Sequence, residues 1–254
     1  MVIRAGQRKA FEQAARRQFE QEMVAHSKGF SPPLCGVIGD EQLLVALRSA
    51  MTRAGGYGFT YRGPIRLFIE MMFLCGSAFD TDPQYKAVGE IMRASGDQMQ
   101  RAEQIHKLVL DNLEKVSGPG AINVRKALSD LLIFAQMPLT VSNGFVSGML
   151  VEMHRVFPQK AACVGDAGLK ALINEGIAEA RRYRFDTTRQ EALLEVLKFA
   201  FGHGCIDDPL DTWIARTPKH ERIIDPAAGA ARLEKKAVTW LEHVVARNDQ
   251  GSHT

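Results

Sequence analysis

The stretch GDEQLLVALRSAMTRAGGYGFTYRGPIRLFIEMMFLCGSAFDTDP, residues 39–83, occurs a second time in this chain in diverged form. Moved forward by 126 positions it falls without a gap on residues 165–209, and 11 of the 45 positions are identical. Average residue usage would give about three identities by chance. The identical residues are mostly apolar or turn-forming: Gly39/Gly165, Asp40/Asp166, Leu43/Leu169, Ala54/Ala180, Tyr57/Tyr183, Phe59/Phe185, Leu67/Leu193, Phe73/Phe199, Gly76/Gly202, Asp82/Asp208 and Pro83/Pro209. Such a repeat predicts two similar structural units and lowers the expectation of an enzyme.

The repeat also organises the rest of the chain. A length of 254 residues suits two units of ordinary domain size, each able to bury its own core. The sequence predicts a first helical unit over residues 1–116 and a second over residues 145–250. A connecting helix and linker occupy residues 117–144. We expect the two units to pack together as one body, with the connecting helix at their junction.

Helical spacing of apolar residues dominates both units. Phe11, Ala15, Phe19 and Met23 follow one another at intervals of four, which predicts a first helix of about 25 residues with one apolar stripe. No segment shows sustained alternation of apolar and polar residues with a period of two. The predicted fold is therefore all-α, with two tandem homologous helical-bundle units.

Several residues are expected to start helices. Asp40 and Asp166 follow glycines and are predicted N-caps, because a short carboxylate can accept the free amides of the first helical turn. Thr60 and Thr188 are predicted to cap the next helix in each unit, Thr188 as part of a capping box. Residues 30–33, which include two prolines, are predicted to form a loop.

A second pair of acidic residues precedes proline. Asp82-Pro83 and Asp208-Pro209 place an N-cap residue before a proline at the first helical position, which is a common helix start. Each pair therefore predicts a further helix. We expect neither carboxylate to bind a metal, because calcium loops require more oxygen ligands at fixed spacings.

The helix predicted at residues 65–75 is apolar nearly all round, so we expect it to be buried on most sides. The helix predicted at residues 121–136 is the nearest candidate to cover it. The corresponding helix of the second unit contains Glu195 and Lys198, which predict one side that faces water.

Composition excludes several classes of protein. The chain is 46% hydrophobic and 24% charged with a net charge of +3, which is too mild to favour nucleic acid. The longest apolar runs, residues 67–75 and 131–139, are too short to span a bilayer. The first 23 residues lack the apolar segment of a secretory signal. Because the cysteines show no paired spacing, we expect a cytoplasmic protein without disulfides or cofactors.

One short segment gathers reactive residue types. His203, Cys205 and Asp207 lie within a few positions of one another and could suggest a metal site or a Cys–His nucleophile. Cys205, however, aligns with Phe79, so its predicted role is to fill apolar space. We therefore predict no catalytic residue and no metal ligand. An enzyme with its site between the two repeats, built from these three residues, is the alternative.

Basic and aromatic residues suggest where a partner binds. Arg16, Arg17, Arg181, Arg182 and Tyr183 form two basic stretches with aromatic neighbours, the residue types that dominate interface hot spots. We predict that these five residues contact a protein partner. A groove between the units is the other place where a client segment could lie. A helical regulator that binds nucleic acid through the same arginines is a further alternative.

The first unit resembles a known group of proteins. The resemblance rests on Phe19-x3-Met23-x2-His26-x3-Phe30-Ser-Pro, on Gly39-Asp40, on Tyr57-Gly-Phe59-Thr60 and on Phe79-Asp-Thr-Asp82-Pro83. These motifs resemble those of small helical bacterial proteins encoded in type VI secretion effector cassettes, near spike and toxin genes. The resemblance is best over residues 5–115 and looser in the second unit. The group usually has one such unit, so the duplication is a departure from its pattern.

The resemblance implies a cytoplasmic protein that holds or neutralises a secreted toxin, as an immunity protein or as a loading chaperone. It brings no catalytic residues with it. The expected partner is therefore a protein, with no nucleic acid and no membrane.

Overall fold

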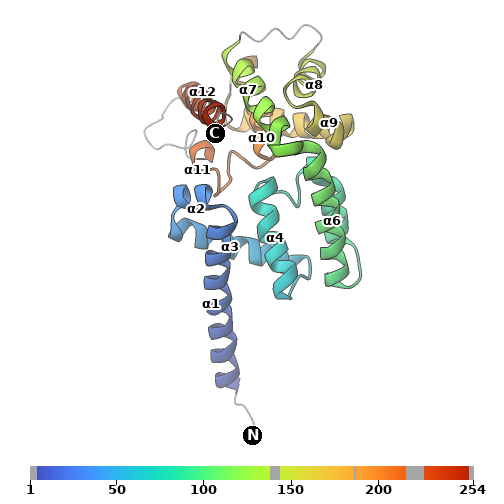
Figure 1. Ribbon diagram of the computed structural model, residues 1–254, viewed down its shortest axis with the longest axis vertical. Helices are drawn as coiled ribbons and strands as arrows, with labels where there is room; N and C mark the ends of the chain where they lie inside the picture. Colours follow the sequence, from blue (N-terminus) through green and yellow to red (C-terminus); the bar gives the residue numbers. More distant parts are fainter. Residues whose placement is uncertain (1–4, 138–143, 186, 216–225, 252–254) are drawn as a thin grey trace.

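The computed structural model describes residues 5–137, 144–185, 187–215 and 226–251. Within these ranges the chain forms helices and turns and contains no strand, which confirms the all-α prediction. No helix there is both long enough and apolar enough to cross a membrane. The elements follow one another in this order (Figure 1): α1 (Ala5–Phe30), α2 (Pro32–Ile38), α3 (Asp40–Gly56), α4 (Arg62–Cys75), η1 (Pro83–Tyr85), α5 (Lys86–Arg93), α6 (Gln98–Ser117), η2 (Pro119–Ala121), α7 (Ile122–Gln136), α8 (Phe145–Val156), α9 (Pro158–Arg182), α10 (Thr188–Phe201), α11 (Thr212–Ala215) and α12 (Pro226–Gly251).

Two hydrophobic cores follow one another along the chain. Helices α1 to α6 enclose the first, in which Leu47, Phe68 and Phe79 are fully buried. Helices α7 to α12 enclose the second, which includes Leu172 and Phe199. In Figure 1 the first core lies in the lower half of the body and the second in the upper half. The ends of α4 and α10 meet between them.

Helix boundaries in the two halves agree with the 126-residue offset of the sequence repeat. Helix α4 and helix α10 begin and end at positions that differ by 126. Helix α3 corresponds to the part of α9 that follows a break at Gly165. The backbone there has φ +73° and ψ 158°, and Gly39, which precedes α3, has φ +79° and ψ 160°. Helices α3 and α9 then end at Gly56 and Arg182, and the residues that follow them, Tyr57 and Tyr183, share φ −89°.

The agreement extends upstream of the segment that the sequence repeat covers. Helix α2 begins at Pro32 and α9 at Pro158, and the residues before them, Ser31 and Phe157, have φ −137° and −144°. On the same offset, α8 corresponds to residues 19–30, the last part of α1. Residues 5–18 of α1 therefore correspond to nothing in α8.

The first part of α1 projects away from the body (Figure 1). Every side chain described between positions 6 and 18 is exposed, and Phe11 is 67% exposed. Farther along the same apolar stripe, Phe19 lies under the Arg62 guanidinium at 4.9 Å, and Met23 is buried in the first core. The predicted stripe is thus present, and packing within this chain uses its second half.

The connecting helix does not take the predicted place over α4. Helix α7 packs mainly against α12 and α8, and Leu131 and Phe134 lie in the second core. Helix α4 is covered by α3, α6 and α1, while Leu74 near its end remains exposed. The reason is that α12 has an apolar face of its own, including Leu233 and Leu241, which a neighbouring helix must bury.

The prediction that α10 has one side in water is wrong. Glu195 is 0% exposed and Lys198 is 2% exposed, because α8, α9 and α12 surround the helix. Lys198 Nζ binds a Glu179 carboxylate oxygen at 2.6 Å. Both Glu195 carboxyl oxygens lie without a hydrogen-bond partner against Gly176 of α9. Burial raises the pKa of Glu195 to about 9, so this side chain is neutral at pH 7 and tolerates its apolar surroundings.

The first predicted caps are displaced by one residue. The N-cap position of α3 is Gly39, and Asp40 is already the first helical residue; neither makes a side-chain cap bond. Asp166 likewise follows the break at Gly165. Positive φ at the glycines, rather than a carboxylate, separates the helices. The predicted loop at residues 30–33 is short because α2 already begins at Pro32, a position where proline needs no amide partner.

The threonine caps also differ from the prediction. Thr187, not Thr188, caps α10, because its side-chain oxygen accepts the amide of Gln190 at 3.2 Å. Thr60 caps no helix; its amide and hydroxyl bind the side chain of Gln98 at 2.7 Å and 3.0 Å. Where two threonines are adjacent, the backbone entering the helix decides which of them is the cap.

Candidate functional site

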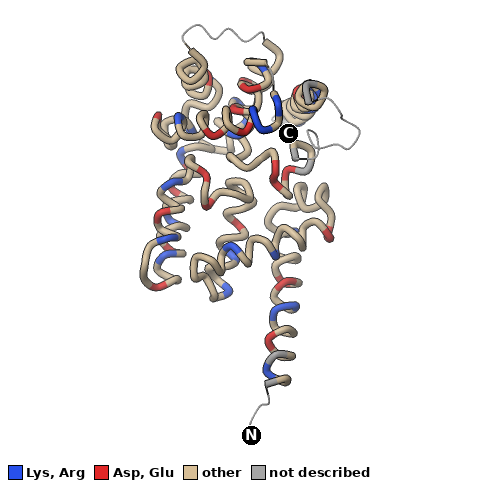
Figure 2. The backbone as a smooth tube through the Cα atoms, turned by 180° about the vertical axis from the view of Figure 1, so that it is seen from behind, with Lys and Arg blue, Asp and Glu red and all other residues tan. Residues whose placement is uncertain are grey.

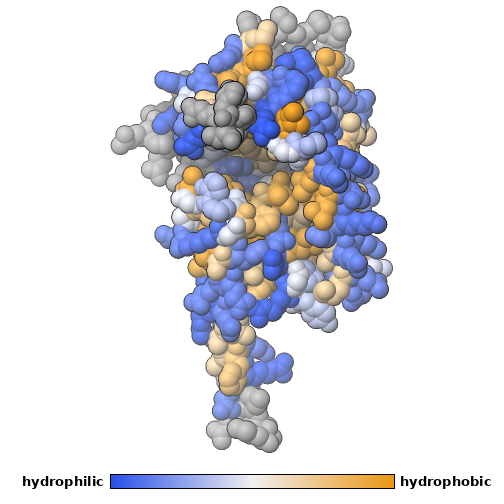
Figure 3. Space-filling model, in the orientation of Figure 1, coloured by the Kyte–Doolittle hydropathy of each residue, from blue (hydrophilic) through white to orange (hydrophobic). Residues whose placement is uncertain are grey.

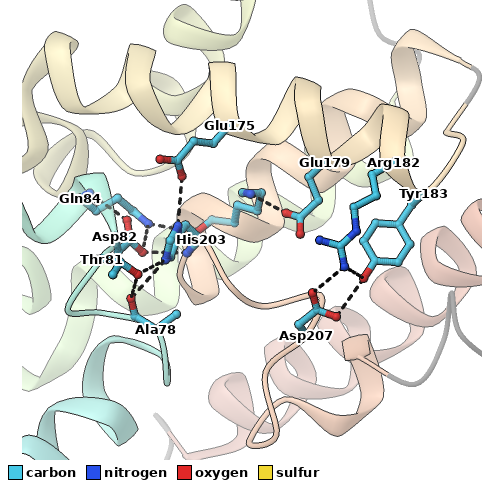
Figure 4. Close-up of polar contacts among 11 residues, drawn as sticks. Ala78, Thr81, Asp82, Gln84, Glu175, Glu179, Arg182, Tyr183, His203 and Asp207 are labelled. Carbon is cyan, nitrogen blue, oxygen red and sulfur yellow. Dashed lines mark hydrogen bonds and ion pairs between the residues drawn. The ribbon is translucent and has the colours of Figure 1, made fainter. Parts of the chain in front are cut away.

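Two buried carboxylates form the junction between the halves. Asp82 Oδ1 accepts the amide of Gln84 at 2.8 Å, which confirms it as the cap of η1. Its Oδ2 accepts the amide of His203 from the other half at 2.7 Å (Figure 4). Asp208 makes the equivalent bonds from the second half. Its Oδ1 accepts the amide of Leu210 at 2.8 Å, and its Oδ2 accepts the amide of Ser77 in the first half at 2.7 Å. Contrary to the prediction, no helix begins directly after Asp208, since α11 starts at Thr212.

Two glycines allow the backbones to approach at this junction. A methyl group on Gly76 would lie 2.7 Å from the carbonyl oxygen of Phe201, and one on Gly202 would lie 2.8 Å from that of Cys75. Both glycines also have positive φ, +90° and +102°. Glycine is therefore required at both positions, for space and for backbone conformation.

His203 joins the halves through its side chain as well as its amide. Its Nδ1 lies 3.0 Å from a carboxylate oxygen of Glu175 in α9. Its Nε2 lies 3.1 Å from Thr81 Oγ1 and 3.2 Å from the carbonyl oxygen of Ala78, both in the first half (Figure 4). These contacts hold the imidazole in place between two elements.

The three residues of the enzyme alternative face different environments. Cys205 is completely buried, as the alignment with Phe79 predicted, and burial raises its thiol pKa far above the usual value. A catalytic thiol needs the opposite shift, because the thiolate is the nucleophile. Asp207 turns toward α9, where it accepts a hydrogen bond from the Tyr183 hydroxyl at 2.9 Å. The geometry thus offers no activated Cys–His pair.

The second basic stretch is partly engaged within the chain. Arg182 lies 3.5 Å from the carboxylate of Asp207 and 5.1 Å from the ring centroid of Tyr183 (Figure 4). Burial, followed by the hydrogen bond to Asp207, raises the pKa of Tyr183. Arg181, one residue earlier, is exposed at the end of α9.

The first basic stretch lies on the projecting part of α1, apart from the second. Arg16 is exposed and lies 3.3 Å from Glu20, whose other oxygen binds Arg48 at 2.7 Å. Arg17 is exposed on the same helix. Figure 2 shows basic and acidic residues alternating along this part of the chain. Helix α1 packs on α2, α3 and α4, whereas α9 packs on α8, α10 and α6, so the two stretches belong to different faces.

A cavity of about 490 Å³ lies between the halves and was not predicted. Its polar lining includes Cys75 and Lys160, which are buried, and Tyr85, which is half-buried. Burial raises the pKa of Cys75 to about 11 and lowers that of Lys160. The sequence signal that could have revealed it is a lysine at a position where the 126-residue offset places Leu34 in the first half.

Across the described part of the chain, no three histidine, cysteine, aspartate or glutamate side chains are grouped closely enough to hold a metal ion. Comparisons with models of protein families, with curated proteins and with solved structures found no match.

Proposed function

We propose that this chain is a protein-binding scaffold, made of two tandem homologous helical units, that holds or neutralises a secreted toxin of a type VI secretion effector cassette. It would act in the cytoplasm, as an immunity protein or a loading chaperone. Support for the duplication comes from the shared helix boundaries and from the reciprocal bonds of Asp82 and Asp208. The cassette assignment rests on the sequence resemblance of the first unit.

The observation that supports binding most directly is the projecting part of α1. Residues 5–18 correspond to nothing in α8, and every side chain described between positions 6 and 18 is exposed. An exposed Phe11 at the centre of this segment costs free energy in water unless a partner covers it. A helix with one apolar stripe is suited to lie in the groove of another protein.

The charge of this segment indicates what kind of groove it fits. Between residues 5 and 19 the sequence has four cations, Arg8, Lys9, Arg16 and Arg17, and one acid, Glu12. Such an excess favours an acidic partner surface and raises the association rate through electrostatic attraction. We therefore propose a client with an acidic groove and an apolar pocket that receives Phe11.

The test is complex formation with the effector encoded beside this chain. Size-exclusion chromatography with light scattering should give the summed mass of one chain and one effector. Phe11→Asp should abolish or strongly reduce co-elution. The matched control is Val151→Asp on α8, since Val151 is 66% exposed and Phe11 is 67% exposed.

If no effector of the cassette co-elutes with this chain, the proposed function is contradicted. Co-elution that Phe11→Asp leaves intact would remove the role of α1. Assaying the toxin in the complex separates the two roles: an immunity protein suppresses its activity, and a chaperone releases an active toxin.

A further inference from the structure

The cavity between the halves is bounded by elements from both. The end of α4, the η1–α5 segment, α6, the start of α7 and the first turns of α9 surround it. Figure 3 shows hydrophobic residues gathered between α4 and α6, below the start of α7. Its volume of about 490 Å³ lies in the range of sites that enclose small organic ligands. Most of its lining is apolar, including Val88, Leu108, Leu113, Val124 and Phe157.

One buried cation faces this apolar space. Lys160 is 8% exposed, and its Nζ donates to the carbonyl oxygen of Phe199 at 2.5 Å and lies 3.4 Å from that of Ala200. The same Nζ lies 5.3 Å from the Phe199 ring and 5.9 Å from the Tyr85 ring. Carbonyl dipoles and ring faces thus surround the ammonium group.

No carboxylate within the described ranges forms an ion pair with Lys160. The nearby Asp82 influences it electrostatically, but both oxygens of that carboxylate accept hydrogen bonds from His203 and Gln84. At the cavity rim, Glu90 lies 3.8 Å from the exposed Lys86. A buried cation without an anionic partner is costly, and an anion bound in the cavity would remove that cost.

The internal repeat shows that the fold does not require this cation. On the 126-residue offset, Leu34 takes the place of Lys160 and Phe201 takes the place of Cys75. Leu34 and Phe201 line a smaller space of about 220 Å³. The first half thus forms the equivalent helices with leucine at this position, whereas the second half has lysine there, beside the larger cavity.

We propose that the cavity binds a small molecule with an apolar body and one carboxylate head group, and that Lys160 holds the head group. The apolar walls accommodate the body, and the ammonium supplies a charge-assisted hydrogen bond in a largely dry environment. This inference is independent of the toxin and of α1.

The experiment uses two probes that differ in the head group alone, decanoate and decanol, titrated calorimetrically into the full chain at pH 7. A charge-assisted hydrogen bond predicts that decanoate binds about 10- to 100-fold more tightly. Lys160→Leu, which copies the residue of the other half, should lose that preference and still bind decanol. Leu113→Trp, which fills the cavity, should weaken both probes.

Circular dichroism should show the parent helix content in both variants. Equal affinity of the parent chain for the two probes, or no binding of either, overturns the proposal without any variant. A preference for decanoate that survives Lys160→Leu overturns the role of the lysine. Affinities that Leu113→Trp leaves unchanged place the ligand elsewhere and overturn the site.

Discussion

Asp82 and Asp208 join the two halves, because each carboxylate accepts an equivalent hydrogen bond from a backbone amide of the opposite half. Each carboxylate is 2% exposed, binds an amide of its own half through Oδ1, and binds an amide of the opposite half through Oδ2 at 2.7 Å. The amides that donate these bonds across the junction, on His203 and Ser77, are themselves 126 positions apart. Exchange of equivalent contacts is typical of two-fold interfaces, and it supports the proposed duplication.

Removing either carboxylate should destabilise the whole chain. Asp82→Ala and Asp208→Ala each leave two backbone amides without their partners, and we expect each to lower the free energy of unfolding by about 1–3 kcal/mol. Asp111→Ala on the exposed face of α6 is the control and should change it by less than about 0.5 kcal/mol. Urea denaturation measures all three. A large loss of unfolding free energy in only one of the two aspartate variants would show that the two carboxylates are not equivalent.

The glycines at the junction give a second test. Gly76→Ala and Gly202→Ala should each cost at least about 2 kcal/mol, since the new methyl group meets a carbonyl oxygen as well as an unfavourable φ. Gly96→Ala separates these causes, because Gly96 has φ +118° with no atom near its substituent. Equal losses of unfolding free energy in all three variants would mean that the close approach contributes nothing.

Glu195 should make stability depend on pH. Its pKa is raised to about 9 in the folded chain from 4.5, so between these values the folded chain retains a proton that the unfolded chain has released. The stability that the retained proton on Glu195 contributes is fully present below about pH 4.5 and is lost as the pH rises toward 9. The slope contributed by this group is at most about 1.4 kcal/mol per pH unit.

The comparison of Glu195→Gln with the parent isolates that contribution. Between pH 5 and 9 the free energy of unfolding should fall less steeply in the variant. A double variant, Gly176→Ala with Glu195→Ile, copies Ala50 and Ile69 of the first half. It should be more stable than the parent at pH 9. Parallel pH profiles for the parent and Glu195→Gln would show that Glu195 is ionised in both the folded and unfolded states.

The basic stretches should affect binding more than stability. Arg17 and Arg181 are the clearest positions, because Arg16 and Arg182 also contact Glu20 and Asp207 within the chain. Arg17→Glu with Arg181→Glu should weaken effector binding about tenfold or more and shift the melting temperature by less than about 2 °C. Undiminished affinity would move the binding surface away from both stretches, to the groove between the halves.

The helical class and the first helix could be predicted from the sequence, because the spacing of apolar residues along a helix is a local signal. Burial of Glu195 and Lys198 could not. Charged residues on a predicted helix normally indicate a side that faces water, and the sequence pattern of one helix does not show that α8, α9 and α12 enclose α10 on all sides. The neutral state of Glu195 and the bond from Lys198 to Glu179 depend on that packing.

The junction and the cavity could not be predicted from the sequence either, because both depend on contacts between the two halves. The helix-capping role of Asp82 follows from Asp-Pro in the sequence, whereas its bond to His203 joins residues 121 positions apart. Lys160 is unremarkable in the sequence, since lysine is common on helix surfaces. Lys160 is noticeable only when the offset of the repeat is applied, because the equivalent residue of the first half is the apolar Leu34.

The most direct test of the proposed function is the stoichiometry of effector binding, measured by isothermal titration calorimetry. Because residues 5–18 of α1 correspond to nothing in α8, we expect one effector per chain, with binding weakened at least about tenfold by Phe11→Asp. Two effectors per chain would mean that features shared by both halves form the binding surface. Either that result or an absence of binding heat would contradict the account.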